Sequence, residues 1–84
     1  MYRLLFAKRV FKDLDRLPQD DFERIENSIQ MLNQNPLPAG SKKLVGERNM
    51  YRIRQGVYRV IYTVDHKLKE VHILGVRHRK DSYR

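Results

Sequence analysis

The chain has 84 residues and a formal net charge of +8 at pH 7. This length fits a single domain, so we expect residues 1–84 to fold as one unit. The absence of cysteine excludes disulfide bridges and cysteine-ligated metal sites, and no apolar run is long enough to span a membrane. We therefore expect a soluble, cytoplasmic protein with no membrane partner.

The positive charge is unevenly distributed along the chain. Lys and Arg balance Asp and Glu over residues 1–40, so the whole excess lies in residues 41–84. A neutral half and a basic half predict a scaffold joined to a surface that binds a polyanion. Nucleic acid is the usual polyanion for a small basic protein. An acidic protein partner is the alternative, and the two are compatible.

The first half of the chain predicts one short strand and two helices. Residues 2–6 are bulky and apolar, as is typical of a strand. The first helix has an apolar stripe at helical spacing that consists of Val10, Phe11, Leu14 and Leu17. Pro18 ends it, and a second helix begins near residues 18–20 with a stripe that consists of Phe22, Ile25, Ile29 and Leu32. We expect a helical hairpin that covers one face of a sheet and carries no chemistry.

The second half predicts a loop and then three successive strands. Residues 35–41 are rich in Pro and Gly, and the chain from Lys42 and Lys43 is expected to be basic and irregular. Strands are predicted at residues 50–54 and 57–64, separated by a turn at Gln55-Gly56, and from residue 68 or 69 to residue 76. Strict alternation would place Val71, Ile73, Gly75 and Arg77 on one face of the last strand. The expected fold is α+β, with the N-terminal strand and helical hairpin packed on a mostly antiparallel four-stranded sheet.

Arginines follow the two central strands around which this half is built. Arg52 and Arg54 share one face of residues 50–54, and Arg59 follows the turn. Arginine keeps its charge at neutral pH and offers a planar set of donors that suits phosphate. Arg59 lies among apolar residues, where a charge usually has a partner or a function. The alternative is a solvated positive face that discourages aggregation of a sheet edge.

The C-terminal segment is basic and contains an aromatic residue. Arg77 follows the last strand in phase with its end, and His78, Arg79, Lys80 and Tyr83 come after it. Tyrosines among basic residues are typical of surfaces where bases stack on rings. Lys42, Lys43, Arg79 and Lys80 are therefore candidate RNA contacts. The alternative for this segment and for the two lysines is a solvated surface.

The order of elements, the segment Tyr-Arg-Ile-Arg-Gln-Gly-Val-Tyr-Arg at residues 51–59 and the closing Gly-Val-Arg-His-Arg-Lys-Asp-Ser-Tyr resemble the RelE/ParE superfamily of toxins. The resemblance runs over essentially the whole chain. It implies a ribonuclease that enters the ribosomal A site and cuts messenger RNA there without a metal or other cofactor. The 2′-hydroxyl of one nucleotide attacks the adjacent phosphate. It also implies a cognate antitoxin partner that blocks the basic site.

The resemblance implies roles for individual residues. Arg52 and Arg54 stand where the family often has lysines, Arg59 matches the arginine after the hairpin turn, and Tyr83 matches the C-terminal tyrosine. Either Arg77 or Arg79 could match the arginine near the C-terminus, and Arg77 is favoured because it ends a strand. An arginine in place of lysine is a poor general base, so His78 or Tyr83 is the expected acid or base.

Two other functions stay open at this stage. The ParE branch inhibits DNA gyrase and lacks the ribonuclease residues, whereas this chain retains Arg59, Arg77 and Tyr83. A catalytically inert member that only binds its antitoxin is the second alternative. It would form a tight complex and cause no growth arrest.

Overall fold

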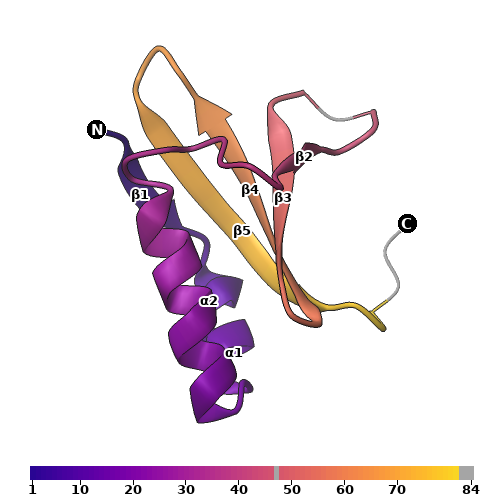
Figure 1. Cartoon of the computed structure of the whole chain (residues 1–84). Coiled ribbons are helices and arrows are strands. Elements are labelled where there is room, and N and C mark those ends of the chain that lie inside the picture. Colours follow the sequence, from indigo (N-terminus) through magenta and orange to yellow (C-terminus); the bar gives the residue numbers. More distant parts are fainter. Residues whose placement is uncertain (47, 82–84) are drawn as a thin grey trace.

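The computed structural model describes residues 1–46 and 48–81, which form two helices and one mixed sheet (Figure 1). The elements in chain order are β1 (Arg3–Phe6), α1 (Lys8–Asp15), α2 (Gln19–Met31), β2 (Lys42–Lys43), β3 (Met50–Gln55), β4 (Tyr58–Asp65) and β5 (Glu70–His78). The strands are ordered β1-β5-β4-β3-β2, with only the β1–β5 pair parallel among the described strands. The α+β class and the mostly antiparallel sheet are therefore confirmed.

The sheet has five strands in the described part of the chain, and the sequence predicted four. The additional strand is β2, which was expected to be irregular and pairs with β3 through Lys42 opposite Arg52 and Lys43 opposite Tyr51. Two residues carry no readable periodicity, so only their pairing with β3 identifies them as a strand. The hairpin turn also lies one residue later than predicted, at residues 56 and 57. Gly56 has φ +62, which glycine adopts without steric cost.

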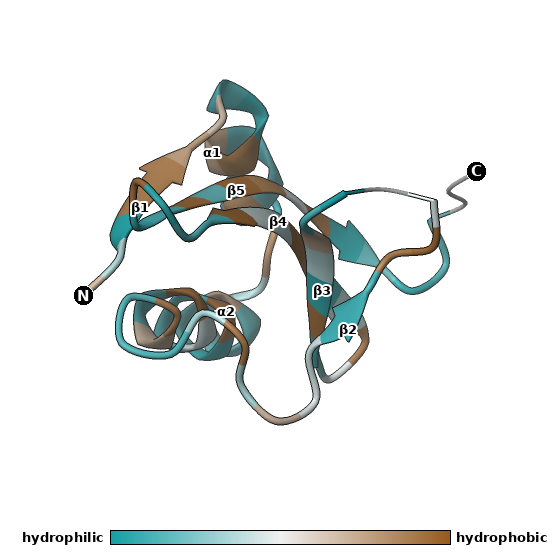
Figure 2. Ribbon diagram, turned by 90° about the horizontal axis from the view of Figure 1, so that it is seen from above, coloured by the Kyte–Doolittle hydropathy of each residue, from teal (hydrophilic) through white to brown (hydrophobic). Residues whose placement is uncertain are grey.

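The two helices cover different parts of the sheet (Figure 2). α2 packs against β3 and β4, whereas α1 lies along β5 beyond the point where β1 ends. Asp20 and Asp21 stand in the first turn of α2, where negative charge suits the helix dipole. No helix in residues 1–46 and 48–81 has the length and apolar character needed to cross a membrane.

The hydrophobic core lies between α2 and the facing side of the sheet. Its buried members are Val10, Ile25, Ile29, Leu32, Ile53, Val60, Tyr62, Val64, Val71, Ile73 and Val76. The predicted stripe of α2 is confirmed at Ile25, Ile29 and Leu32. The stripe of α1 is wrong at Phe11, which is 58% exposed. This short helix packs along one strand, so Val10 takes the buried position and the ring of Phe11 lies outside against Phe6, at 5.9 Å between centroids.

Tyr62 is the largest fully buried side chain of this core. Its hydroxyl donates a hydrogen bond to the carbonyl oxygen of Pro36 at 2.9 Å. Burial raises the pKa of Tyr62 to about 12, so the phenol stays protonated and remains a donor. The bond ties the loop after α2 to the central strand of the sheet.

A β-bulge in β5 changes which side chains face the core. Tyr62 pairs with Ile73 and Ile61 pairs with Gly75, so Leu74 is the extra residue between the two pairs. Val71 and Ile73 point to the core, but Gly75 and Arg77 point to the opposite face. The prediction that all four share one face is therefore wrong, because one inserted residue inverts the alternation beyond it.

Glu70, at the start of β5, gives the fold a pH dependence. Hydrogen bonds from Arg3 and from Nε2 of His72 (3.0 Å to Oε1) hold the pKa of Glu70 below its ordinary value of 4.5. A depressed folded-state pKa contributes stability that is present above the unfolded-state pKa and lost as the pH falls through the folded-state pKa. We expect the free energy of unfolding to fall as the pH drops below 4.5, and to fall less in Glu70→Gln.

Urea unfolding at a series of pH values measures this difference. Glu26→Gln is the matched control, because Glu26 is an exposed glutamate of α2. It should keep the wild-type pH dependence. Equal pH dependence in Glu70→Gln and the wild type would contradict the assignment of this pH-dependent stability to Glu70.

Candidate functional site

The register of the sheet brings the predicted arginines together on one face. Arg54 pairs with Arg59 across β3 and β4, and Arg59 pairs with Arg77 across β4 and β5. Arg52 lies two residues before Arg54, so its side chain is on the same side of β3. We call this surface, which is defined by Arg52, Arg54, Arg59 and Arg77, the arginine face. It lies on the side of the sheet opposite the core.

The arginine face extends to the short edge strand. Lys42 of β2 pairs with Arg52, so both side chains leave the same side of the sheet. Lys42 and Arg52 begin a row of paired residues that runs across the strands, and Ile61 of β4 and Gly75 of β5 continue it. A row with a lysine, an arginine, an isoleucine and a glycine thus runs beside the row with three arginines, and the two rows form one rigid cationic surface.

The charges on this face repel one another. Burial lowers the pKa of Arg52, and the neighbouring charges of Arg54 and Arg59 lower it further. The ion pairs among the described residues join Arg3 to Glu70, Arg9 to Asp13, Arg24 to Asp21 and His72 to Glu70. None of these pairs lies at Arg52, Arg54 or Arg77. Like charges gathered on a rigid surface are typical of a site for an anionic ligand, since that ligand relieves their repulsion.

The structure does not bring Lys43 to the arginine face. Lys43 pairs with Tyr51, whose ring stacks on that of Tyr62 at 6.0 Å between centroids. Because Tyr62 is in the core, Lys43 leaves the sheet on the helix side. Adjacent residues of a strand alternate, so only one of two neighbouring lysines can face the arginines.

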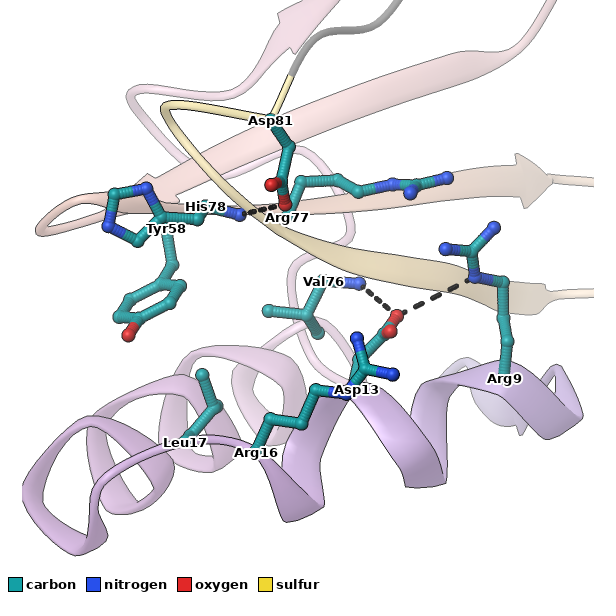
Figure 3. A pocket seen from close by; sticks show the side chains of 9 residues that line it. All are labelled: Arg9, Asp13, Arg16, Leu17, Tyr58, Val76, Arg77, His78 and Asp81. Atoms are coloured by element: carbon teal, nitrogen blue, oxygen red, sulfur yellow. Dashed lines mark hydrogen bonds and ion pairs between the residues drawn. The ribbon is translucent and has the colours of Figure 1, made fainter.

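His78 also lies away from the arginine face. It pairs with Tyr58, and the two rings meet edge to face at 5.3 Å between centroids. Figure 3 shows Arg77 and His78 leaving β5 in different directions. Nδ1 of His78 accepts a hydrogen bond from the backbone N–H of Lys80 at 3.0 Å, which leaves the proton of the neutral ring on Nε2. His78 therefore organises the turn that follows β5.

The structure describes only two of the three remaining C-terminal candidates. Arg79 and Lys80 are exposed in the turn after β5, and the backbone N–H of Arg79 donates to the carbonyl oxygen of Val57 at 2.6 Å. Tyr83 lies outside the described residues. Of the two candidate arginines, Arg77 lies on the arginine face and Arg79 lies beyond the strand.

Two cavities adjoin the arginine face, and sequence reasoning missed several of the residues that line them. One of about 530 Å³ lies between α1 and the end of β5, and Arg9, Asp13 and Arg16 line it together with Arg77 (Figure 3). The other, of about 740 Å³, lies at the opposite end of the same face and includes Arg48, Thr63, His66 and His72. The alternation of β4 would have indicated Thr63. No signal in the sequence indicated the residues of α1, because they reach this face only through the packing of α1 on β5.

The chain matches a known toxin family over almost its whole length. Residues 4–83 match the family model described as the ParE toxin of the type II toxin–antitoxin system parDE. Toxin RelE3 of Methanocaldococcus jannaschii is 35% identical over 85 residues, which cover 96% of this chain and 94% of that protein.

Solved structures of two toxin–antitoxin complexes contain a chain with the same fold. The archaeal RelE–RelB complex from Pyrococcus horikoshii aligns with a TM-score of 0.81 and 32% identity, over 96% of this chain and 98% of that chain. The toxin–antitoxin complex RelBE2 from Mycobacterium tuberculosis aligns with a TM-score of 0.81 and 30% identity, over 93% and 98%. The family model and these relatives define the class as a toxin of a type II toxin–antitoxin system. The chain belongs to the RelE/ParE superfamily of such toxins.

Proposed function

We propose that the protein is an endoribonuclease that acts in the cytoplasm, enters the ribosomal A site and cuts the messenger RNA there without a metal cofactor. The observation that carries the proposal is the alignment of Arg54, Arg59 and Arg77 on three adjacent strands, with Arg52 beside them. Fixed guanidinium groups at this spacing suit the phosphates of a single RNA strand. The similarity to toxins named RelE supports the same function.

The proposed reaction is a transesterification within the RNA. The 2′-oxygen loses its proton and forms a bond to the adjacent phosphorus, the bond from phosphorus to the 5′-oxygen breaks, and that oxygen takes up a proton. The products are a 2′,3′-cyclic phosphate and a 5′-hydroxyl. Negative charge that develops on the phosphate oxygens would be stabilised by the fixed charges of Arg59 and Arg77, while Arg52 and Arg54 hold the RNA backbone.

Proton transfer is proposed for Tyr83. The opposite placement of His78, against Tyr58 and within a turn, argues against a direct role for the imidazole. Arginine is a poor proton carrier because it keeps its proton near neutral pH, so the arginine face supplies charge and not a base. Arginines around a tyrosine would favour its phenolate.

We also propose that an antitoxin covers the arginine face. Two of the similar structures are complexes of a RelE toxin with its partner. The excess of positive charge in residues 41–84 favours a partner segment that is acidic. Binding of such a segment would compete with RNA for the same guanidinium groups.

A translating extract tests the proposed function. Purified protein is added to the extract and to the same RNA without ribosomes, and 5′ ends are mapped by primer extension. We expect new ends within codons of the translated message only. Arg52→Ala and Tyr83→Phe should lose these cuts and relieve growth arrest. Intact message in the extract would contradict the proposal.

Inhibition of DNA gyrase is the second candidate, because the family model that matches residues 4–83 is that of the ParE toxin. A supercoiling assay with the same protein separates the two functions. Loss of supercoiling together with intact message would favour the gyrase inhibitor. No effect in either assay would favour a module that only binds its antitoxin.

A further inference from the structure

Asp13 of α1 binds the backbone of β5 at the outer edge of this strand. β1 pairs with β5 only as far as Phe6 opposite Ile73, so the outer edge of β5 has no strand partner beyond that point in the described part of the chain. There, Oδ2 of Asp13 accepts a hydrogen bond from the backbone N–H of Val76 at 2.9 Å. The Asp13 side chain is only 13% exposed. A carboxylate from α1 thus replaces the missing strand, directly after the bulge at Leu74.

The same carboxylate lies on the side of β5 that carries Gly75 and Arg77. The point that a Cβ atom would occupy at Gly75 is 3.4 Å from Oδ2 of Asp13 and 3.7 Å from Nε of Arg77. Nε of Arg9 is 3.6 Å from this point and 3.7 Å from Oδ2 of Asp13. Gly75 therefore leaves the space in which Asp13 forms its ion pair with Arg9, on the side of β5 where the Nε atom of Arg77 also lies (Figure 3).

We propose that Asp13 is a positioning residue that holds Arg77 in line with Arg54 and Arg59 on the arginine face. Its hydrogen bond to Val76 fixes the backbone beside Arg77. Its negative charge pairs directly with Arg9 and attracts the guanidinium of Arg77 from beyond ion-pair distance, which leaves the N–H groups of Arg77 available to a ligand. The proposal deepens the proposed function, because it names the residue that orients one of the phosphate-binding arginines.

The variant Asp13→Asn, compared with the control Asp21→Asn, separates a role in positioning Arg77 from a role in supporting β5. Asp13→Asn keeps an oxygen that can accept from the Val76 N–H but removes the negative charge, so it should fold even if Asp13→Ala does not. Asp21→Asn is the matched control, because Asp21 is an aspartate paired with Arg24 on α2, with its Oδ1 3.3 Å from the arginine Nη2. Both substitutions change the net charge equally.

The first readout is independent of catalysis. NMR resolves the Nε–Hε group of arginines, and its heteronuclear NOE reports how rigidly each side chain is held. We expect the NOE of Arg77 to be high in the wild type and in Asp21→Asn, and to fall in Asp13→Asn to the level of the exposed Arg24. An unchanged Arg77 signal in Asp13→Asn would overturn the proposal, whether or not the protein cleaves RNA.

The second readout is a double-mutant cycle on cleavage of ribosome-bound message. Because misplacement of a catalytic group by about 1 Å can cost up to about 100-fold, we expect Asp13→Asn to lower the rate about tenfold. In the Arg77→Ala background it should cause no further loss, since there is no guanidinium left to orient. An equal loss in both backgrounds would show that Asp13 acts through the fold and would overturn the proposal. If the wild type cleaves no RNA, the proposed function fails and the NMR result alone decides the role of Asp13.

Discussion

Replacing Arg59 with alanine is expected to lower the rate of messenger RNA cleavage by about 100- to 1,000-fold, the usual cost of removing one group that stabilises transition-state charge. Arg59 is half-buried on the central strand and lies between Arg54 and Arg77. The loss should appear mainly in kcat, because the charge on the phosphate develops only in the transition state. Single-turnover cleavage on programmed ribosomes measures it.

Arg24→Ala is the control for Arg59→Ala. Arg24 forms an exposed ion pair with Asp21 on α2, remote from the arginine face, and its loss changes the net charge by the same amount. We expect cleavage by Arg24→Ala to stay within about twofold of the wild type, since exposed ion pairs contribute little. Equal losses in the two variants would mean that total charge, and not the arginine face, determines activity.

Truncation of Ile29 is expected to have the largest effect on stability. Ile29 lies in the middle of the buried face of α2 and is 1% exposed. Ile29→Ala should lower the free energy of unfolding by about 2–5 kcal/mol, through lost burial and the cavity left behind. In a domain of this size each kcal/mol shifts the Tm by about 4–8 °C, so the melting temperature should fall by about 10 °C or more.

Met31→Ala is the control for this truncation, because Met31 is on the same helix and is 70% exposed. It should change the free energy of unfolding by less than about 0.5 kcal/mol. Calorimetry of Ile29→Ala and Met31→Ala measures both losses of stability relative to the wild type. A loss of similar size at Met31 would contradict the burial of α2 described above.

The helices could be predicted because their periodicity is local. The stripe of α2 at Ile25, Ile29 and Leu32 requires only the helical repeat, and tertiary packing confirmed it. The stripe of α1 failed at Phe11, since a sequence pattern states which residues are apolar and not how wide a surface the neighbouring strand will cover.

The arginine face could be predicted only in part. Alternation placed Arg52 with Arg54, and the register of the hairpin set Arg59 opposite Arg54. The position of Arg77 depends on the bulge at Leu74, because strict alternation would have turned Arg77 toward the core. A bulge depends on how two strands align with each other, so no local sequence pattern predicts it.

The surroundings of the face depend on contacts between distant segments. Asp13 and Gly75 meet only because α1 follows β1 and packs along the edge that β1 leaves open. His78 was a reasonable acid or base by residue type. Its pairing with Tyr58 directs it to the other side of the sheet.

The most direct test of the account is cleavage of a message in which a single 2′-hydroxyl has been removed. Two messages are loaded on ribosomes with the same codon in the A site, one all-ribose and one with 2′-deoxyribose at the mapped cleavage position. We predict that the protein cuts the first, leaves a 2′,3′-cyclic phosphate, and does not cut the second at that position. Equal cutting of both would exclude attack by the 2′-hydroxyl, and cutting of neither would contradict the assignment of the arginine face to RNA cleavage.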